Sequence, residues 1–172
     1  YVANVVGFCG DRSLPAGVWG TNDNGDGVNN TPRTSYFGTY VRYIKNVAQF
    51  TCPEPSRDLY TTTDSSIGNK SLTYPVGLIS YDELVFAGMD QRHINKLSWA
   101  YSTQHYWTMS PSHFAAAGGA ARDWRLLSVG SLTGTWVIDD YAARPVINLK
   151  SDVKITGGTG TANDPFVVNT NN

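Results

Sequence analysis

The sequence carries little charge and no excess of either sign. Its 172 residues include 13 lysines and arginines against 14 aspartates and glutamates, and charged residues make up 16% of the chain. A net charge of −1 leaves no electrostatic basis for binding nucleic acid or an anionic membrane surface. We therefore expect no nucleic-acid partner.

Long apolar runs are missing as well. The longest apolar stretches are only a few residues, far short of the ~20 that a transmembrane helix needs, and we expect no signal peptide within these residues. We expect no direct membrane insertion by these residues. Because the chain begins in mid-pattern at Tyr1 (YVANVVGFC), we also expect any anchor to lie in a segment that precedes it.

Cysteine is scarce. Cys9 and Cys52 are the only two, neither belongs to a CxxC motif, and no histidine cluster lies near either one. This pattern argues against a metal site. We predict a disulfide between Cys9 and Cys52, which indicates an oxidising compartment. Two buried free thiols are the alternative.

The chain also has few residues suited to catalysis. Only three histidines are present, at 93, 105 and 113, and none lies in an HExxH, GxSxG or phosphate-binding glycine motif. Asp139 and Asp140 are adjacent, so in a strand they point apart and do not form the facing carboxylate pair of a glycosidase. We predict that the chain is not an enzyme.

Aromatic and small residues take the place of charge. The sequence has 10 tyrosines, 5 tryptophans and 17 glycines, a composition typical of an extracellular β-rich or loop-rich binding domain. A chain of this length is predicted to form one domain, residues 1–172, with a sizeable core.

Local patterns predict two helices and several short strands. The first helix follows a cap at Thr34 or Ser35, and the second follows a capping box of Ser80 and Glu83 and ends near Gly88. Strands are expected at 1–9, 74–79, 97–101, 143–153 and 165–168, the fourth central and the last at an edge, with an irregular loop at 14–33.

The loop contains the run Asn22-Asp23-Asn24-Gly25-Asp26, whose carboxylate and amide oxygens suit calcium. It departs from the twelve-residue calcium loop, because glycine stands at the third and fifth positions counted from Asp23 and no glutamate closes it. We expect a plain polar turn and no cofactor, with calcium as the alternative.

The most informative stretch runs from Tyr106 to Leu149. Within it, two sets of residues alternate: Arg125, Leu127, Val129, Ser131 and Thr133 against Leu126, Ser128, Gly130 and Leu132. In a strand the two sets face opposite ways. The second set suits a packed face, and the varied first set suits a surface that contacts a ligand. An ordinary hairpin turning at Val129-Gly130-Ser131 is the alternative.

The aromatic residues of this stretch divide into two groups. Trp136 follows the loop-like run Thr133-Gly134-Thr135, so it is predicted to be an exposed anchor of the kind that dominates protein interfaces. Tyr106, Trp124, His113 and Tyr141 would add aromatic contacts. For Trp107 and Trp124 we favour core packing.

Several blocks together resemble a known class of protein. They look like bacterial cell-surface proteins, prepilin-like or surface-anchored, whose ectodomain has a C-type-lectin-like fold of the formylglycine-generating-enzyme type. The resemblance spans nearly the whole chain and implies an α+β fold with two helices, short twisted antiparallel strands and long irregular loops. The blocks are FCGDR at 8–12, LYTTTDSSIGNK at 59–70, YPVGLI at 74–79 with Asp82 and Glu83, YWTMSP at 106–111, and RPVINLKSDV at 144–153.

In such proteins the segment between the last two blocks is rich in Asn, Ser and Gly, and here it is not. The departure resembles the variable proteins of diversity-generating retroelements, in which adenine-directed mutagenesis changes asparagine codons. It implies a diversified binding face at about residues 112–140. The expected ligand-binding residues are His113, Arg125, Leu127, Val129, Ser131, Thr133, Thr135, Trp136, Ile138, Asp139 and Asp140.

The function predicted from these features is ligand binding or adhesion at a bacterial cell surface or on a phage particle, with an unidentified protein or glycan as ligand. A structural pilin-like subunit and a carbohydrate-binding lectin are the alternatives. The usual carboxylate-amide-proline sugar motif of calcium-dependent lectins is missing from the sequence, which weighs against the lectin.

Overall fold

The computed structural model describes residues 1–15, 35–115, 120–161 and 163–169. The candidate calcium run Asn22–Asp26 and the cap residue Thr34 lie outside these ranges.

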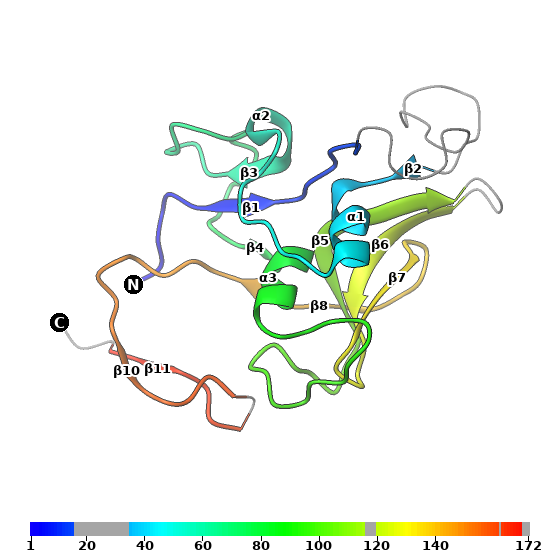
Figure 1. Ribbon diagram of the computed structural model, residues 1–172. Helices are drawn as coiled ribbons and strands as arrows, with labels where there is room; N and C mark the ends of the chain where they lie inside the picture. The colour runs from blue at the N-terminus through cyan, green and yellow to red at the C-terminus, as the bar shows by residue number, and fades with distance from the viewer. Residues whose placement is uncertain (16–34, 116–119, 162, 170–172) are drawn as a thin grey trace.

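The largest sheet has five strands. Its hydrogen-bonded order is β2-β5-β6-β7, all antiparallel, and a fifth strand pairs in parallel with the start of β5 (Figure 1). The strands are β2 (Ser35–Tyr36), β5 (Tyr106–Ala115), β6 (Ala120–Leu126), β7 (Leu132–Trp136) and β8 (Ala142–Ala143).

Three two-stranded sheets accompany the large one. Strand β1 (Gly7–Cys9) pairs with β3 (Leu59–Thr61), and β4 (Gly77–Leu78) pairs with β9 (Pro145–Val146). The third pair, β10 (Ile155–Gly157) and β11 (Val167–Val168), forms a hairpin that projects from the rest of the molecule (Figure 1).

The helices of the described residues are short. They are α1 (Gly38–Lys45), α2 (Pro55–Asp58) and α3 (Tyr81–Phe86). The predicted capping box is confirmed in α3, where Ser80 Oγ accepts from the backbone N–H of Glu83 and the Glu83 carboxylate accepts from the backbone N–H of Ser80. The cap predicted at Thr34 or Ser35 is wrong, because Ser35 lies in β2 and Phe37 precedes α1 without a side-chain cap. None of the described helices has the length and apolar character needed for a membrane span.

The predicted fold class is wrong. The described residues are mostly β, with four sheets, one of them curled into a half-barrel, and do not form the two-helix α+β C-type-lectin-like fold. The physical reason is length: α1 has eight residues and α3 six, so each covers part of a sheet without forming a layer.

Two predicted strands also fail. The expected central strand 143–153 breaks into the two-residue strands β8 and β9, on either side of Arg144, followed by turns. The expected strand 97–101 is irregular, and Ser98 makes only an isolated bridge to Thr161. The edge strand near the C-terminus is confirmed as β11, although it is shorter than predicted.

The core lies between the large sheet and the helices. Trp124 and Tyr106 are each 1% exposed, and Trp124 contacts Tyr40 and Tyr43 of α1 and Tyr81 of α3. We call this the inner face of the sheet. Figure 1 shows α1 and α3 in front of it.

Hydrogen bonds between buried polar groups connect the helices to this face. The Trp124 indole N–H donates to Thr39 Oγ1 at 3.1 Å, and Ser110 Oγ accepts the backbone N–H of Tyr81 at 2.9 Å. Buried polar groups satisfied in this way hold α1 and α3 in one position on the sheet.

The predicted disulfide is confirmed. Cys9 at the end of β1 is bonded to Cys52, 43 residues further along, and their Cα atoms are 5.7 Å apart. The bond joins β1 to the segment that precedes α2.

Candidate functional site

Strands β6 and β7 form the hairpin that holds most of the candidate residues. The chain turns at 128–130, and the backbone N–H of Leu127 donates to the carbonyl of Ser131 at 2.8 Å. Gly130 has φ +88°, and a Cβ there would lie 2.9 Å from the carbonyl oxygen of Asn95, so the turn needs glycine. The hairpin that was the alternative interpretation of the alternating residues is therefore present.

On the packed side of this hairpin the predicted alternation is confirmed for three of its four residues, because Ser128 is only half-buried. Leu126, Gly130 and Leu132 are buried, and Leu126 lies directly opposite Leu132 in the register. Of the other set, Arg125 lies opposite Thr133 and both are half-buried, while Val129 is exposed at the turn. Arg125 and Thr133 therefore point away from the core.

A compact polar and aromatic cluster occupies the side of the sheet opposite α1 and α3, which we call the outer face. Trp107 of β5, Arg125 of β6 and Thr133 of β7 follow one another across three strands in direct register. Thr135 lies on the same side of β7, opposite Asp123 of β6.

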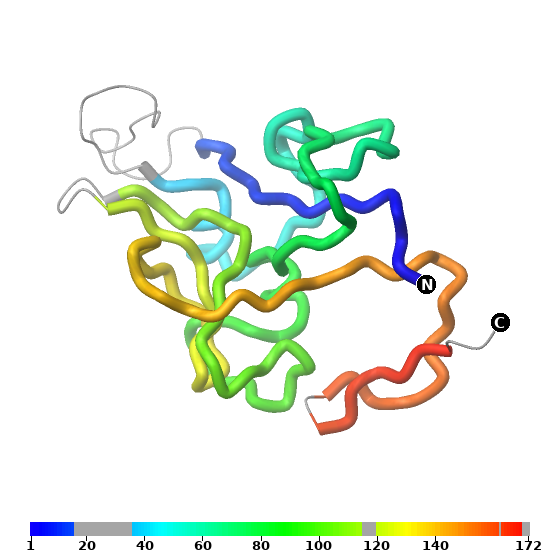
Figure 2. The backbone as a smooth tube through the Cα atoms, turned by 180° about the vertical axis from the view of Figure 1, so that it is seen from behind, coloured from blue at the N-terminus to red at the C-terminus, as the bar shows by residue number. Residues whose placement is uncertain are grey.

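Residues 137–143 cross the outer face. After β7 the chain passes over the sheet to the far edge of β5, where Ala142 and Ala143 pair with Tyr106 and Trp107; Figure 2 shows this crossover, in gold, running in front of the sheet. Asp139 on the crossover accepts hydrogen bonds from Thr135 Oγ1 at 3.0 Å and Tyr141 Oη at 3.3 Å.

Arg125 lies at the centre of the outer face. Its guanidinium carbon is 3.9 Å from the ring centroid of Tyr141, and that ring meets Trp107 edge to face at 5.1 Å. Among the described residues no carboxylate forms an ion pair with Arg125, and its buried Nε has no hydrogen-bond partner. A guanidinium that stacks on a ring and lacks a carboxylate partner in the described residues is suited to bind a carboxylate of a ligand.

The structure separates the predicted site residues into three groups. Arg125, Thr133, Thr135 and Asp139 meet at the outer face, and Ile138 and Asp140 are exposed on the crossover beside it. Leu127, Val129 and Ser131 surround the turn at one end of the hairpin. His113 and Trp136 lie toward the other end, in register with Arg122, on the inner side.

The aromatic predictions were partly right. Trp136 is 42% exposed, as expected for an anchor, and Trp124 is core, as favoured. Tyr106 is buried and its hydroxyl donates to the carbonyl of Ala100, so it does not face a ligand. Trp107, favoured as core, is half-buried against Tyr141 on the outer face.

Arg122 and Asp123 were missed. Neither belongs to the alternating set that begins at Arg125, although counting back along the strand would have placed Asp123 on the face of Arg125.

Two titratable side chains of the hairpin region have shifted pKa values. Burial raises the pKa of Asp123 to about 7, although the backbone N–H of Trp124 donates to its carboxylate at 2.7 Å. Burial, helped by the charge of Arg122, lowers the pKa of His113 to about 4. Folding therefore disfavours the charged form of both groups.

These shifts predict opposite dependences of stability on pH. The folded pKa of His113 lies below its ordinary value of 6.5, so this group stabilises the fold less as pH falls from 6.5 to 4. The folded pKa of Asp123 lies above its ordinary value of 3.8, so stability is lost as pH rises from 3.8 to 7. Between pH 4 and 6.5 the two contributions nearly cancel.

Single substitutions should expose each contribution. We expect Asp123→Asn to stabilise the protein by about 1–3 kcal/mol at pH 8, because it removes a partly buried charge that solvent only partly screens. At pH 4 the carboxyl group is neutral and the substitution should have little effect. The stability of the Asp123→Asn variant, which retains His113, should rise with pH between 4 and 6.5. The stability of the His113→Gln variant, which retains Asp123, should fall over the same range. Urea unfolding from pH 4 to 8 measures both slopes, and parallel profiles for the two variants would contradict the assignment.

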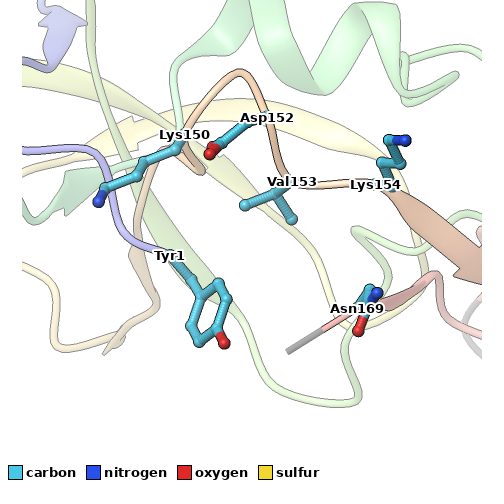
Figure 3. A pocket seen from close by; sticks show the side chains of 6 residues that line it. All are labelled: Tyr1, Lys150, Asp152, Val153, Lys154 and Asn169. Carbon is cyan, nitrogen blue, oxygen red and sulfur yellow. The ribbon is translucent and has the colours of Figure 1, made fainter. Parts of the chain in front are cut away.

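Two cavities away from the outer face are less suited to ligand binding. A cavity of about 310 Å³ is lined by Lys150, Asp152 and Lys154, but Figure 3 shows the two lysine ammonium groups pointing away from each other. An apolar cavity of about 400 Å³ contains Arg144 and Glu83. Both are used by the scaffold, because Arg144 donates to the carbonyls of Trp99 and Ala100 and Glu83 caps α3. Specific sites need polar groups that converge on the ligand.

Metal ligands do not gather in the described parts of the chain, where no three His, Cys, Asp or Glu side chains are placed to hold an ion. Comparisons with protein-family models, with curated proteins and with solved structures found no match. The site is therefore interpreted from its geometry.

Proposed function

We propose that this chain is a surface-displayed binding module whose outer face takes a protein or glycan ligand and is diversified in sequence. The observation that carries the proposal is the separation of two roles along the same strands. Arg125, Thr133 and Thr135 project to the outer face, while their neighbours Trp124, Leu126 and Leu132 make the core.

This separation allows exchange of the outer side chains. A substitution that changes the volume of a core residue costs several kcal/mol, whereas the outer side chains are only half-buried, so exchanging them leaves no cavity in the core and costs less. The strands can then present many different outer faces on one backbone. This is the property that the resemblance to variable proteins of diversity-generating retroelements implies.

The chemistry of the outer face suits recognition. Tryptophan, tyrosine and arginine are the side chains that most often dominate binding energy at interfaces. Here Trp107, Tyr141 and Arg125 form one stack, with the Thr135 hydroxyl and the Asp139 carboxylate beside it. The Cys9–Cys52 disulfide agrees with display in an oxidising environment outside the cell.

Sequencing the coding DNA and its flanks in several isolates tests the proposal. We expect amino-acid differences to concentrate at Arg125, Thr133, Thr135, Ile138, Asp139 and Asp140, at codons where a nearby near-copy carries adenine. The matched controls are Trp124, Leu126 and Leu132 on the same two strands, which should not vary. An invariant segment without a near-copy, or variation equal at both sets, would rule out diversification.

Functional tests separate the two alternatives. In a pilin-like subunit, substitutions on the outer face would abolish assembly of an appendage. In a calcium-dependent lectin, glycan binding would be lost on adding a chelator. The proposal instead predicts that outer-face substitutions change the ligand and leave folding intact.

A further inference from the structure

A second cluster lies on the inner side of the same sheet, toward the end away from the hairpin turn. Tyr36 of β2 pairs with His113 of β5, His113 with Arg122 of β6, and Arg122 with Trp136 of β7. These four residues form a continuous row across four strands, with Tyr40 of α1 next to it. We call the five side chains the aromatic row.

The rings of the row support one another. Tyr36 lies 4.4 Å from Tyr40 and 5.5 Å from His113, between ring centroids, and Tyr40 meets His113 edge to face at 5.3 Å. Contacts between several elements restrict the rotamers of these side chains. A surface ordered before binding loses less conformational entropy when a ligand arrives.

Arg122 is the cation of the row, and it has no acidic partner among the described residues. Its guanidinium carbon lies 5.7 Å from the Trp136 ring, its buried Nε has no hydrogen-bond partner, and no ion pair joins it to a carboxylate in the parts of the chain that the structure describes. By contrast, Arg42 is paired with Asp11 and Asp82. Because His113 remains neutral near pH 7, Arg122 provides the only positive charge of the row.

Trp136 is the exposed apolar side chain of the row. It is the last residue of β7 and is 42% exposed, and the crossover begins directly after it at Val137. A tryptophan ring in contact with water offers area for an apolar side chain of a partner. The turn is held by the Asp139 N–H, which donates to the carbonyl of Trp136 at 3.2 Å.

We propose that the aromatic row binds an acidic segment of a protein partner. A glutamate or aspartate of the segment pairs with the guanidinium of Arg122, and an apolar side chain next to it packs on Trp136. Charge complementarity and the Trp-Tyr-Arg composition both favour a protein segment. This site is separate from the outer face of Arg125, so it stands whether or not that face is diversified.

Selection from a random peptide library displayed on phage tests the proposal. Peptides are selected on the wild-type protein after depletion on Arg122→Gln. We expect the retained peptides to carry Glu or Asp next to an aromatic or aliphatic residue. Their synthetic forms should lose about tenfold or more in affinity through Arg122→Gln, or through Glu→Gln in the peptide. Trp136→Ala should weaken binding as well.

Arg125→Gln is the matched control, because it removes a stacked arginine from the opposite face of the same strand. It should leave the affinity of these peptides unchanged, and thermal unfolding verifies that each variant is folded. The proposal is overturned if no acidic peptide is retained, or if Arg125→Gln weakens binding as much as Arg122→Gln. Arg122-dependent binding to acidic sugars on a glycan array, without peptide binding, would replace the protein partner with a glycan.

Discussion

Replacing Arg42 with alanine is expected to destabilise the fold by about 3–5 kcal/mol, because it leaves buried carboxylates without their counter-charge. Arg42 Nε and Nη2 both donate to the Asp82 carboxylate at 2.7 Å, and Nη2 also lies 2.6 Å from Asp11 Oδ2. All three residues are buried. Urea unfolding at pH 7 measures the loss.

The network of Arg42, Asp82 and Asp11 connects parts of the chain that are distant in sequence. Arg42 lies on α1, Asp82 lies on α3, and Asp11 follows β1. Asp82 also accepts the backbone N–H of Gln49 at 2.9 Å, and Asp11 accepts the hydroxyl of Ser13 at 2.5 Å. Removing Arg42 therefore affects both helices that cover the inner face, and indirectly the rows of side chains on the sheet beneath them.

Four further variants make the Arg42 result specific. Arg42→Lys keeps the charge and loses the two-pronged contact with Asp82, so an intermediate loss is expected. Arg92→Ala removes an exposed arginine and should change stability by less than ~0.5 kcal/mol. In a double-mutant cycle, Arg42→Ala and Asp82→Asn should be non-additive. Additive effects, or a loss from Arg42→Ala no larger than that from Arg92→Ala, would show that the network does not hold the helices.

Reducing the Cys9–Cys52 disulfide is expected to lower the free energy of unfolding by up to ~4 kcal/mol, the value that the chain-entropy relation gives for a loop of this size. The bond spans 43 residues and no free cysteine is present. Its removal lets the unfolded chain explore many more conformations. The measurement is urea unfolding with and without a reductant.

The control for this experiment is the Cys9→Ser, Cys52→Ser double variant. It should unfold at the same lower urea concentration with or without reductant. A wild-type protein whose midpoint stays unchanged after complete reduction, verified by thiol titration, would show that the folded state and not the loop closure supplies the stability.

Several features were predictable because they depend on residues close together in sequence. The capping box of Ser80 and Glu83 involves two residues three positions apart. The glycine at 130 allows the positive φ that the hairpin turn requires. The alternation of Arg125 and Leu126 follows from the geometry of any strand.

The fold class was not predictable in the same way. The helical patterns around Tyr40 and Leu84 were correctly recognised, but the helices are only eight and six residues long and do not form a layer of their own. Residues 143–153 alternate like a strand, yet they have different partners in succession: β8 pairs with β5, and β9 pairs with β4. A strand pattern shows that a segment can pair, and it does not show with what.

The candidate site residues were predicted as one set, and the tertiary structure places them in separate parts of the surface. Trp107 and Arg125 are 18 positions apart in the sequence, and Tyr141 reaches both only because the crossover passes over the outer face. The aromatic row needs Tyr36, which is 77 positions from His113. Strand register and crossover path decide such contacts.

By itself, the sequence determined the turn, the packed side of the hairpin, the cap of α3 and the two cysteines available for a disulfide. Only the tertiary structure decided which aromatic ring lies beside each arginine, Tyr141 beside Arg125 and Trp136 beside Arg122. The physical reason is range. Backbone geometry and capping act between near neighbours, whereas a binding surface is assembled by long-range pairing, whose register depends on packing of the whole chain.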